Sequence, residues 1–202
     1  SAIMWRIANV DDDNLDYLQN AIVDRSRTTD PKLYESSLLF AKKITHGLNQ
    51  SISHFQAVEY ISKELSLNGF NHIKESDNWK LKAGGKYFFT RNQSALFAFT
   101  IGSDINLNTT KFKIIGTHTD SPNLRLAPNS WTKSGNVEKL HLQKYGGGLW
   151  NTWFDRDLSV CGKIIYKENE IIKTKLVRIE ESLFNIPSLA IHLTDKSKPF
   201  DW

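Results

Sequence analysis

The stretch that organises the chain is Lys111-Phe-Lys-Ile-Ile-Gly-Thr-His-Thr-Asp-Ser-Pro122. Its apolar run, residues 112–115, predicts a buried strand, because β-branched side chains cluster there and Gly116 ends the run. His118 and Asp120 follow just beyond the end of that strand. Side chains two positions apart in extended backbone point to the same face, so an imidazole and a carboxylate are expected side by side. In open α/β sheets the carboxyl end of a strand is also where the chemistry is placed.

This pair has two interpretations. In the first, His118 binds a metal ion through one ring nitrogen, and Asp120 accepts a hydrogen bond from the other nitrogen or is itself a ligand. In the second, the histidine merely ends a strand and the aspartate belongs to a turn before Pro122. Two donors do not make a zinc site, so for an isolated His-x-Asp the second interpretation is the commoner one.

Composition limits the classes of function. The 202 residues are enough for one ordinary domain or two small ones, and 40% are hydrophobic, which predicts a sizeable core. The net charge of +4 comes from interspersed lysines and arginines, whereas a nucleic-acid partner would require clustering. No apolar run approaches the roughly 20 residues of a membrane span. Cys161 is the only cysteine, which excludes an internal disulfide and a thiolate zinc cluster and predicts a reducing, cytoplasmic location.

Two helices are expected in the first third of the chain. Residues 1–30 are interpreted as a peripheral arm with a possible helix after residues 11–13. Asp30 and Pro31 form a good helix start, and an apolar stripe then continues to about Leu48 and is expected to be core. A second helix is predicted to begin after Ser53 and to end at Gly69.

The remainder is expected to be mostly β-structure, and after Pro122 no amphipathic helix is evident. An Arg91-Asn-Gln93 turn suggests that the first two strands form a hairpin. The strands expected are residues 86–90, 94–101, 112–115, 140–143, 158–166, 175–178 and 189–193.

Three segments together resemble the aspartyl aminopeptidases, a family of zinc exopeptidases. They are Gly116-Thr-His-Thr-Asp-Ser-Pro-Asn-Leu-Arg-Leu126, Tyr145-Gly-Gly-Gly-Leu-Trp-Asn-Thr-Trp-Phe-Asp-Arg-Asp-Leu158 and Ile186-Pro-Ser-Leu-Ala-Ile-His-Leu193. Weaker similarity includes Thr90-Arg-Asn92, so the resemblance spans about residues 31–195. The middle segment is long and unusual in composition, which makes chance a poor explanation.

The resemblance implies an α/β fold class in two parts. Residues 31–121 would form the N-terminal part of a zinc-exopeptidase α/β domain. Residues 122–202 would form part of a β-rich dimerisation domain. Subunits of the family pair as homodimers and assemble further into dodecamers, and no nucleic-acid or membrane partner is implied.

The resemblance also implies an activity and three site residues. The family removes N-terminal acidic residues, Asp or Glu, from peptides by zinc-activated water, with two zinc ions in the complete enzyme. Within that scheme His118 is a metal ligand and Asp120 orients it as a catalytic residue. His192 would reach from the dimerisation domain into the neighbouring subunit's active site. There it would bind substrate and help to stabilise the tetrahedral intermediate.

Three features do not follow the catalytic pattern directly. The family usually has a histidine where Gln56 stands, and His54, two residues earlier, is expected to be a surface or capping residue. Glu180 and Glu181 resemble the glutamate pair of a two-zinc aminopeptidase, but they precede the His192 segment and are expected to lie in surface turns. A structural and interface role is expected for residues 146–157, where glycines precede large aromatic side chains.

The remaining metal ligands and the general base are expected in polypeptide outside these 202 residues. The chain alone is therefore predicted neither to hold two zinc ions nor to hydrolyse peptides. The alternative function is a catalytically inactive oligomerisation or regulatory fragment of such an enzyme. A related zinc exopeptidase or deacylase with a different specificity is a third possibility.

Overall fold

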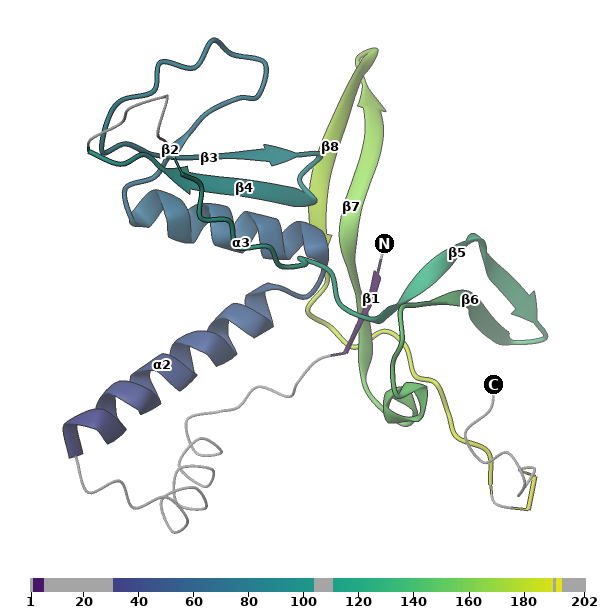
Figure 1. The fold of residues 1–202 in the computed structure, drawn as a ribbon. Coiled ribbons are helices and arrows are strands. Elements are labelled where there is room, and N and C mark those ends of the chain that lie inside the picture. Colours follow the sequence, from purple (N-terminus) through teal and green to yellow (C-terminus); the bar gives the residue numbers. More distant parts are fainter. Residues whose placement is uncertain (1, 6–30, 104–110, 191, 194–202) are drawn as a thin grey trace. The chain divides into compact units, whose positions relative to one another are not determined.

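The computed structural model describes residues 2–5, 31–103, 111–190 and 192–193 (Figure 1). The described chain forms two compact units. The first comprises residues 1–49, 122–161 and 177–202, and the second comprises residues 50–121 and 162–176. The possible helix after residues 11–13 and the Asp30 cap lie outside the described residues. None of the helices described is long and apolar enough to cross a membrane.

A five-stranded antiparallel sheet has the order β6-β5-β1-β7-β8, and most of β7 and β8, residues 162–176, is assigned to the second unit. Its strands are β1 (Ala2–Trp5), β5 (Asn123–Ser134), β6 (Val137–Tyr145), β7 (Leu158–Glu168) and β8 (Ile171–Arg178). β1 pairs with both β5 and β7, with Ala2 opposite Arg125 on one side and Cys161 on the other. The expectation of a wholly peripheral arm is therefore wrong for residues 2–5. Four residues are too few to show a periodicity, so only the pairing identifies this strand.

The core of the first unit is centred on two leucines, Leu124 in β5 and Leu158 in β7. Leu124 is 0% exposed and Leu158 is 1% exposed. The residues packed against them are Leu126, Leu142, Trp150, Trp153, Phe184 and Ile186. The two tryptophans come from a short 3-10 helix, Trp150–Trp153, so the structural part of their expected role is confirmed.

The expected strand at residues 189–193 is wrong. The segment before it runs alongside β7 instead. Phe184 forms an isolated antiparallel β-bridge with Leu158, and the Leu158 amide donates to the Phe184 carbonyl at 3.0 Å. Further on, the Leu193 amide donates to the Ala190 carbonyl at 2.8 Å and closes a turn. Pro187 has no amide hydrogen to continue the pairing, which explains why the ladder does not extend.

Gly146, which follows β6, occupies a position that favours glycine. Its φ is +80°, and an added Cβ would lie 3.3 Å from Pro122 Cγ. We expect Gly146→Ala to lower the free energy of unfolding by about 1–2 kcal/mol, because a left-handed backbone strains any L side chain. Urea unfolding checks this result. Gly147→Ala is the control, since an added Cβ there meets nothing within 4 Å. Equal stability of the two variants would contradict the account.

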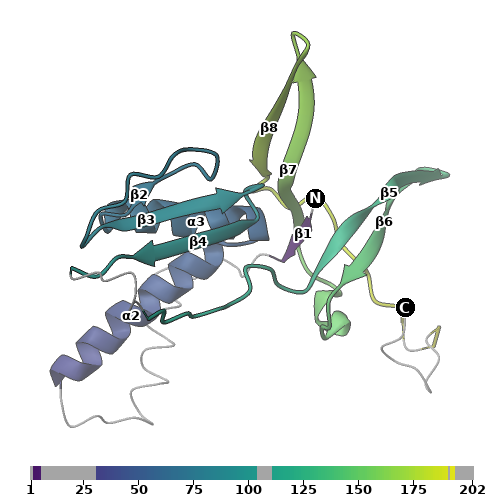
Figure 2. The ribbon, with the colours of Figure 1, turned by 45° about the horizontal axis from the view of Figure 1, so that its top comes forward.

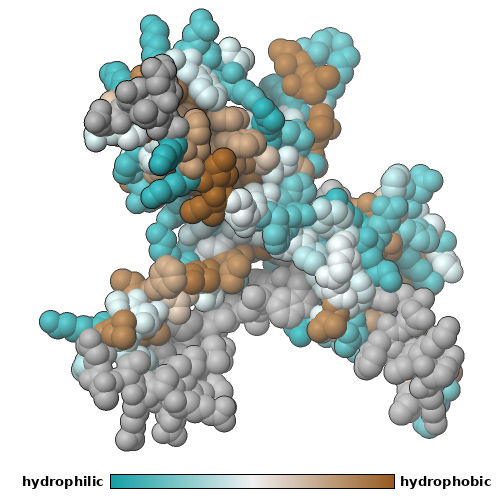
Figure 3. Space-filling model, in the orientation of Figure 1, coloured by the Kyte–Doolittle hydropathy of each residue, from teal (hydrophilic) through white to brown (hydrophobic). Residues whose placement is uncertain are grey.

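Helix α2, Pro31–Gln50, is present as predicted, but its apolar stripe is not core. None of its residues is buried, and Leu39 and Leu48 are 71% and 62% exposed. Periodicity predicts that a helix has an apolar face, but it does not say what covers that face. Exposed apolar side chains also gather at the outer end of the β7–β8 hairpin, at Ile164, Ile165, Ile171 and Ile172 (Figure 3).

The second unit places one helix against a three-stranded sheet (Figures 1 and 2). The sheet order is β2-β3-β4, with β2 at Asn71–His72, β3 at Lys86–Arg91 and β4 at Ala95–Thr100. Helix α3, His54–Leu67, contacts β3 and β4. The predicted hairpin is confirmed, and its buried side chains are Tyr87, Phe88 and Phe89.

Both ends of α3 follow the predicted signals. The Ser53 hydroxyl oxygen accepts from the Phe55 and Gln56 amides at 3.2 and 3.4 Å, which satisfies free donors of the first turn. At the other end Gly69 has a φ of +79°, and its amide donates to the Ser66 carbonyl at 3.1 Å. The Phe70 amide donates to the Leu65 carbonyl at 3.0 Å, which completes a Schellman motif.

Candidate metal centre

His118 and Asp120 lie on one side of the chain, in contact, as the sequence predicts. His118 Nδ1 is 2.7 Å from the Asp120 carbonyl oxygen and 3.3 Å from Asp120 Oδ1. A carbonyl oxygen only accepts, so Nδ1 carries the hydrogen and donates it. In the neutral ring this leaves the lone pair on Nε2, the nitrogen that can bind a metal. The His118 side chain is 78% exposed, so Nε2 is accessible from outside the unit.

The segment leading to this pair differs from the expected buried strand. Residues 112–115 pair with no strand among the described residues. Phe112, Ile114 and Ile115 are 82%, 86% and 96% exposed. The β-branched side chains predict an extended conformation and a tendency to be buried, but burial needs a partner surface that the sequence pattern cannot identify.

The donor atoms of His118 and Asp120 are of the kinds that bind zinc, but two residues are too few for a complete zinc site. Zinc takes imidazole nitrogen and carboxylate oxygen and is usually held by three or four protein ligands. Over the described ranges, no group of three or more His, Cys, Asp or Glu side chains could hold a metal ion. His118 with Asp120 could therefore supply only one ligand and its orienting partner.

Comparison with known proteins then decides the family. A family model described as "Aminopeptidase I zinc metalloprotease (M18)" matches residues 48–201. The chain belongs to the M18 family. The predicted resemblance is thereby confirmed over most of the chain.

Curated relatives are identical to the chain at more than two-fifths of the aligned positions. The aspartyl aminopeptidase of Dictyostelium discoideum is 42% identical over 160 residues, which is 79% of this chain and 33% of the relative. The probable aspartyl aminopeptidase of Ricinus communis is 46% identical over 151 residues, which is 72% of this chain and 30% of the relative. The chain thus spans about one third of the length of these relatives.

Solved M18 structures share the fold. The cryo-EM structure of the Ape4 and Nbr1 complex matches with a TM-score of 0.74 and 38% identity, over 80% of this chain and 31% of that chain. The structure of the S. cerevisiae mApe1 dodecamer matches with a TM-score of 0.64 and 26% identity, over 76% of this chain and 36% of that chain. The predicted α/β fold class is confirmed by these neighbours and by the mixture of helices and sheets.

The other predicted M18 site residue, His192, is not in a strand. It lies exposed in the turn at residues 192–193, in the first unit, whereas His118 belongs to the second. Its action in a neighbouring subunit stays a prediction. Glu180 and Glu181 are exposed, and Glu180 forms an ion pair with Arg178, in agreement with the expected surface position.

Gln56, where the resemblance led us to expect a histidine, has a structural role here. It is 5% exposed, and the Ser53 hydroxyl donates to its side-chain oxygen. Serine at the cap with glutamine three residues later forms a variant of the capping box. His54 is not the capping residue, which is Ser53. Its ring is half-buried and lies 3.9 Å from that of Phe55.

The acidic residue Asp155, in the glycine- and tryptophan-rich segment, also serves the fold. Its Oδ1 accepts from the Ser188 amide at 2.9 Å. Hydrogen bonds from the Ser188 side chain, first, and from its amide lower the pKa of the Asp155 carboxyl. The Asp155 amide in turn donates to the Ile186 carbonyl at 2.9 Å. Because the two segments lie more than thirty residues apart, no local signal in the sequence indicates this pairing.

Proposed function

We propose that the chain is the metal-binding part of a zinc-dependent aminopeptidase that removes acidic residues from peptide N-termini. The observation that carries the proposal is the hydrogen bond from His118 Nδ1 to the Asp120 carbonyl, which leaves Nε2 exposed. Membership of the M18 family supports zinc as the metal. The names of the relatives support a preference for N-terminal aspartate.

Each residue of the pair has a defined task in this proposal. When bound, zinc would polarise the scissile carbonyl and lower the pKa of the attacking water. His118 would hold the ion through Nε2, with the ring in the tautomer fixed by its Nδ1 hydrogen bond. Asp120 would restrain the ring twice, through its carbonyl oxygen and through the carboxylate 3.3 Å away. Such outer contacts raise the basicity of a metal-bound imidazole and fix its orientation.

A zinc site requires further donors. We propose that they come from polypeptide that corresponds to the other two thirds of the relatives. We also propose that the protein is a homo-oligomer in which His192 serves the neighbouring subunit. The dodecamer named for the mApe1 neighbour supports this assembly. We also propose a cytoplasmic location, which the use of one cysteine, Cys161, and no internal disulfide supports.

A chimera tests the activity. In it, this chain replaces the matching third of the Dictyostelium discoideum aspartyl aminopeptidase. We expect zinc-dependent release of N-terminal Asp and Glu at least about tenfold faster, in kcat/KM, than release of Ala, Leu or Lys, which corresponds to about 1.4 kcal/mol or more in transition-state binding. Hydrolysis with another preference would indicate a related exopeptidase. Loss of hydrolysis in an intact chimera, with the parent active, would favour the inactive fragment.

A further inference from the structure

We propose that Thr119 is a positioning residue. Its hydrogen bond holds the loop that carries His118 and Asp120 against the β3–β4 turn, so that these two residues face outward together. The inference rests on the proposed function and assigns a task to a side chain between the two members of the pair. Thr119 Oγ1 donates to the Ser94 carbonyl at 2.9 Å. This hydrogen bond joins segments 25 residues apart, and both residues are half-buried.

The three neighbouring side chains have different partners. Thr119 Oγ1 donates to the Ser94 carbonyl, whereas His118 contacts Asp120 and its side chain is 78% exposed. A threonine hydroxyl is short, so its hydrogen bond holds the backbone of its own residue close to the acceptor. The bond therefore fixes the backbone between His118 and Asp120 and leaves the His118 ring exposed.

The acceptor lies on a turn that is itself held firmly. Asn92 and Gln93 have φ of +50° and +56°, and the Ser94 amide donates to the Arg91 carbonyl at 3.0 Å. Lys163 Nζ donates to the Asn92 carbonyl at 3.0 Å and to Asn92 Oδ1 at 2.8 Å. The Ser94 carbonyl is thus fixed both by the ladder of β3 and β4 and by a side chain from outside the hairpin.

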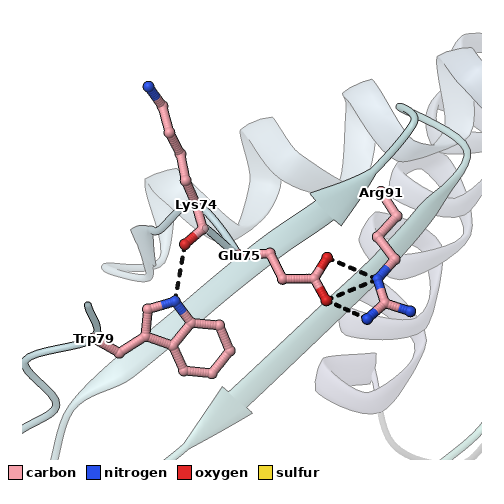
Figure 4. Close-up of polar contacts among 4 residues, drawn as sticks. All are labelled: Lys74, Glu75, Trp79 and Arg91. Atoms are coloured by element: carbon pink, nitrogen blue, oxygen red, sulfur yellow. Dashed lines mark hydrogen bonds and ion pairs between the residues drawn. The ribbon is translucent and has the colours of Figure 1, made fainter. Parts of the chain in front are cut away.

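Arg91, the first residue of the turn, is held by hydrogen bonds to Glu75 (Figure 4). Arg91 Nε donates to both carboxylate oxygens of Glu75, at 2.8 and 3.0 Å, and Arg91 Nη2 also donates to Oε1. The guanidinium lies 5.4 Å from the Phe97 ring centre. Nearby, Trp79 Nε1 donates to the Lys74 carbonyl at 2.9 Å (Figure 4). An exposed ion pair adds little stability, so its contribution here is to the geometry of the turn.

Loss of the anchor would act on the histidine through the backbone. With Thr119 released, the Asp120 carbonyl is no longer held opposite His118 Nδ1, and the ring redistributes between its two neutral tautomers. The form with hydrogen on Nε2 cannot bind a metal through that nitrogen. Outer contacts of this kind change metal affinity by about 10- to 100-fold.

Nitrogen NMR of the histidine rings in the metal-free chain tests the proposal. The spectra are recorded at about pH 9, where free imidazole is neutral and its nitrogen shifts report the tautomer. The His118 signals are identified by their loss in His118→Ala. We expect the Nδ1–H form to predominate in the native chain and to fall at least twofold in Thr119→Val. Thr119→Ser, which keeps the hydroxyl, should restore it.

Two further variants complete the test. Thr152→Val removes a similar hydroxyl-to-carbonyl bond, to Leu149, far along the sequence, and should leave the His118 tautomer unchanged. Lys163→Met removes the bonds to Asn92 without touching the loop and should shift the tautomer in the same direction as Thr119→Val. An unchanged tautomer in both Thr119→Val and Lys163→Met would overturn the proposal. So would a native ring with hydrogen mainly on Nε2.

Zinc affinity of the chimera separates this inference from the proposed function. Thr119→Val should weaken zinc binding by about 10- to 100-fold, and Thr119→Ser should not. If His118→Ala leaves zinc binding intact, the proposed function fails even where the tautomer responds. If His118 is needed but Thr119→Val binds zinc as tightly as the parent chimera, only the positioning role fails.

Discussion

His118→Ala should lower the kcat/KM of the chimera for peptides with N-terminal aspartate by about a thousandfold or more. In the proposed function the imidazole is the ligand that this chain would supply, and the stabilisation that a bound metal gives to a transition state is several kcal/mol. Each 1.36 kcal/mol corresponds to a factor of about ten in rate. Release of N-terminal aspartate, measured with zinc in excess, checks the result.

A matched histidine provides the control for that substitution. His141, in β6, is also exposed, and its Nε2 lies 3.3 Å from Thr132 Oγ1, outside the candidate site. His141→Ala is expected to retain activity within about twofold, as surface substitutions usually do. If His118→Ala retained more than a tenth of the activity, its role as a metal ligand would be refuted.

Leu124→Ala should lower the free energy of unfolding of the first unit by about 2–5 kcal/mol, the usual range for a fully buried leucine. Leu124 is 0% exposed and packs with Leu158, from β7, in the core between the strands. Truncation removes apolar contacts on both sides and leaves a cavity that the sheet cannot close. Urea unfolding followed by circular dichroism measures the loss.

The corresponding surface leucine is Leu149, which is 76% exposed. Leu149→Ala should change stability by no more than about 0.5 kcal/mol. If both variants lost the same stability, Leu124 would not be the centre of this core. The prediction is independent of the metal, so it tests the fold alone.

Elements with local signals could be predicted from the sequence. Ser53 and Gly69 mark the two ends of α3, and both make the backbone hydrogen bonds that these residue types favour. The β3–β4 hairpin was predicted from two runs of aromatic and β-branched residues separated by a turn at residues 91–93. Each of these signals concerns residues close in sequence, so no knowledge of the tertiary fold was needed.

Elements defined by distant partners could not be predicted. Residues 2–5 become a central strand only because β5 and β7 lie on either side. The apolar run at residues 112–115 has the composition of a buried strand, yet it pairs with none of the described strands. Periodicity predicts which side chains require burial, whereas the covering surface is a property of the tertiary structure.

In the candidate site, too, local contacts could be predicted and contacts between distant residues could not. His118 and Asp120 were predicted to lie together because alternation in extended backbone is a local rule, and the resemblance gave the pair its meaning. Thr119 and Arg91 were not singled out, since their partners Ser94 and Glu75 are 25 and 16 residues away. A residue with a hydroxyl group between the two members of a ligand pair is nevertheless a signal that can be sought in other sequences.

The most direct measurement is the position of zinc relative to His118. Crystals of the chimera, measured on both sides of the zinc absorption edge, would locate the ion by anomalous scattering. We predict zinc about 2.0–2.1 Å from His118 Nε2, the ordinary zinc–imidazole distance, with Nδ1 still donating to the Asp120 carbonyl. Zinc bound in the active site without His118, or through its Nδ1, would contradict the account.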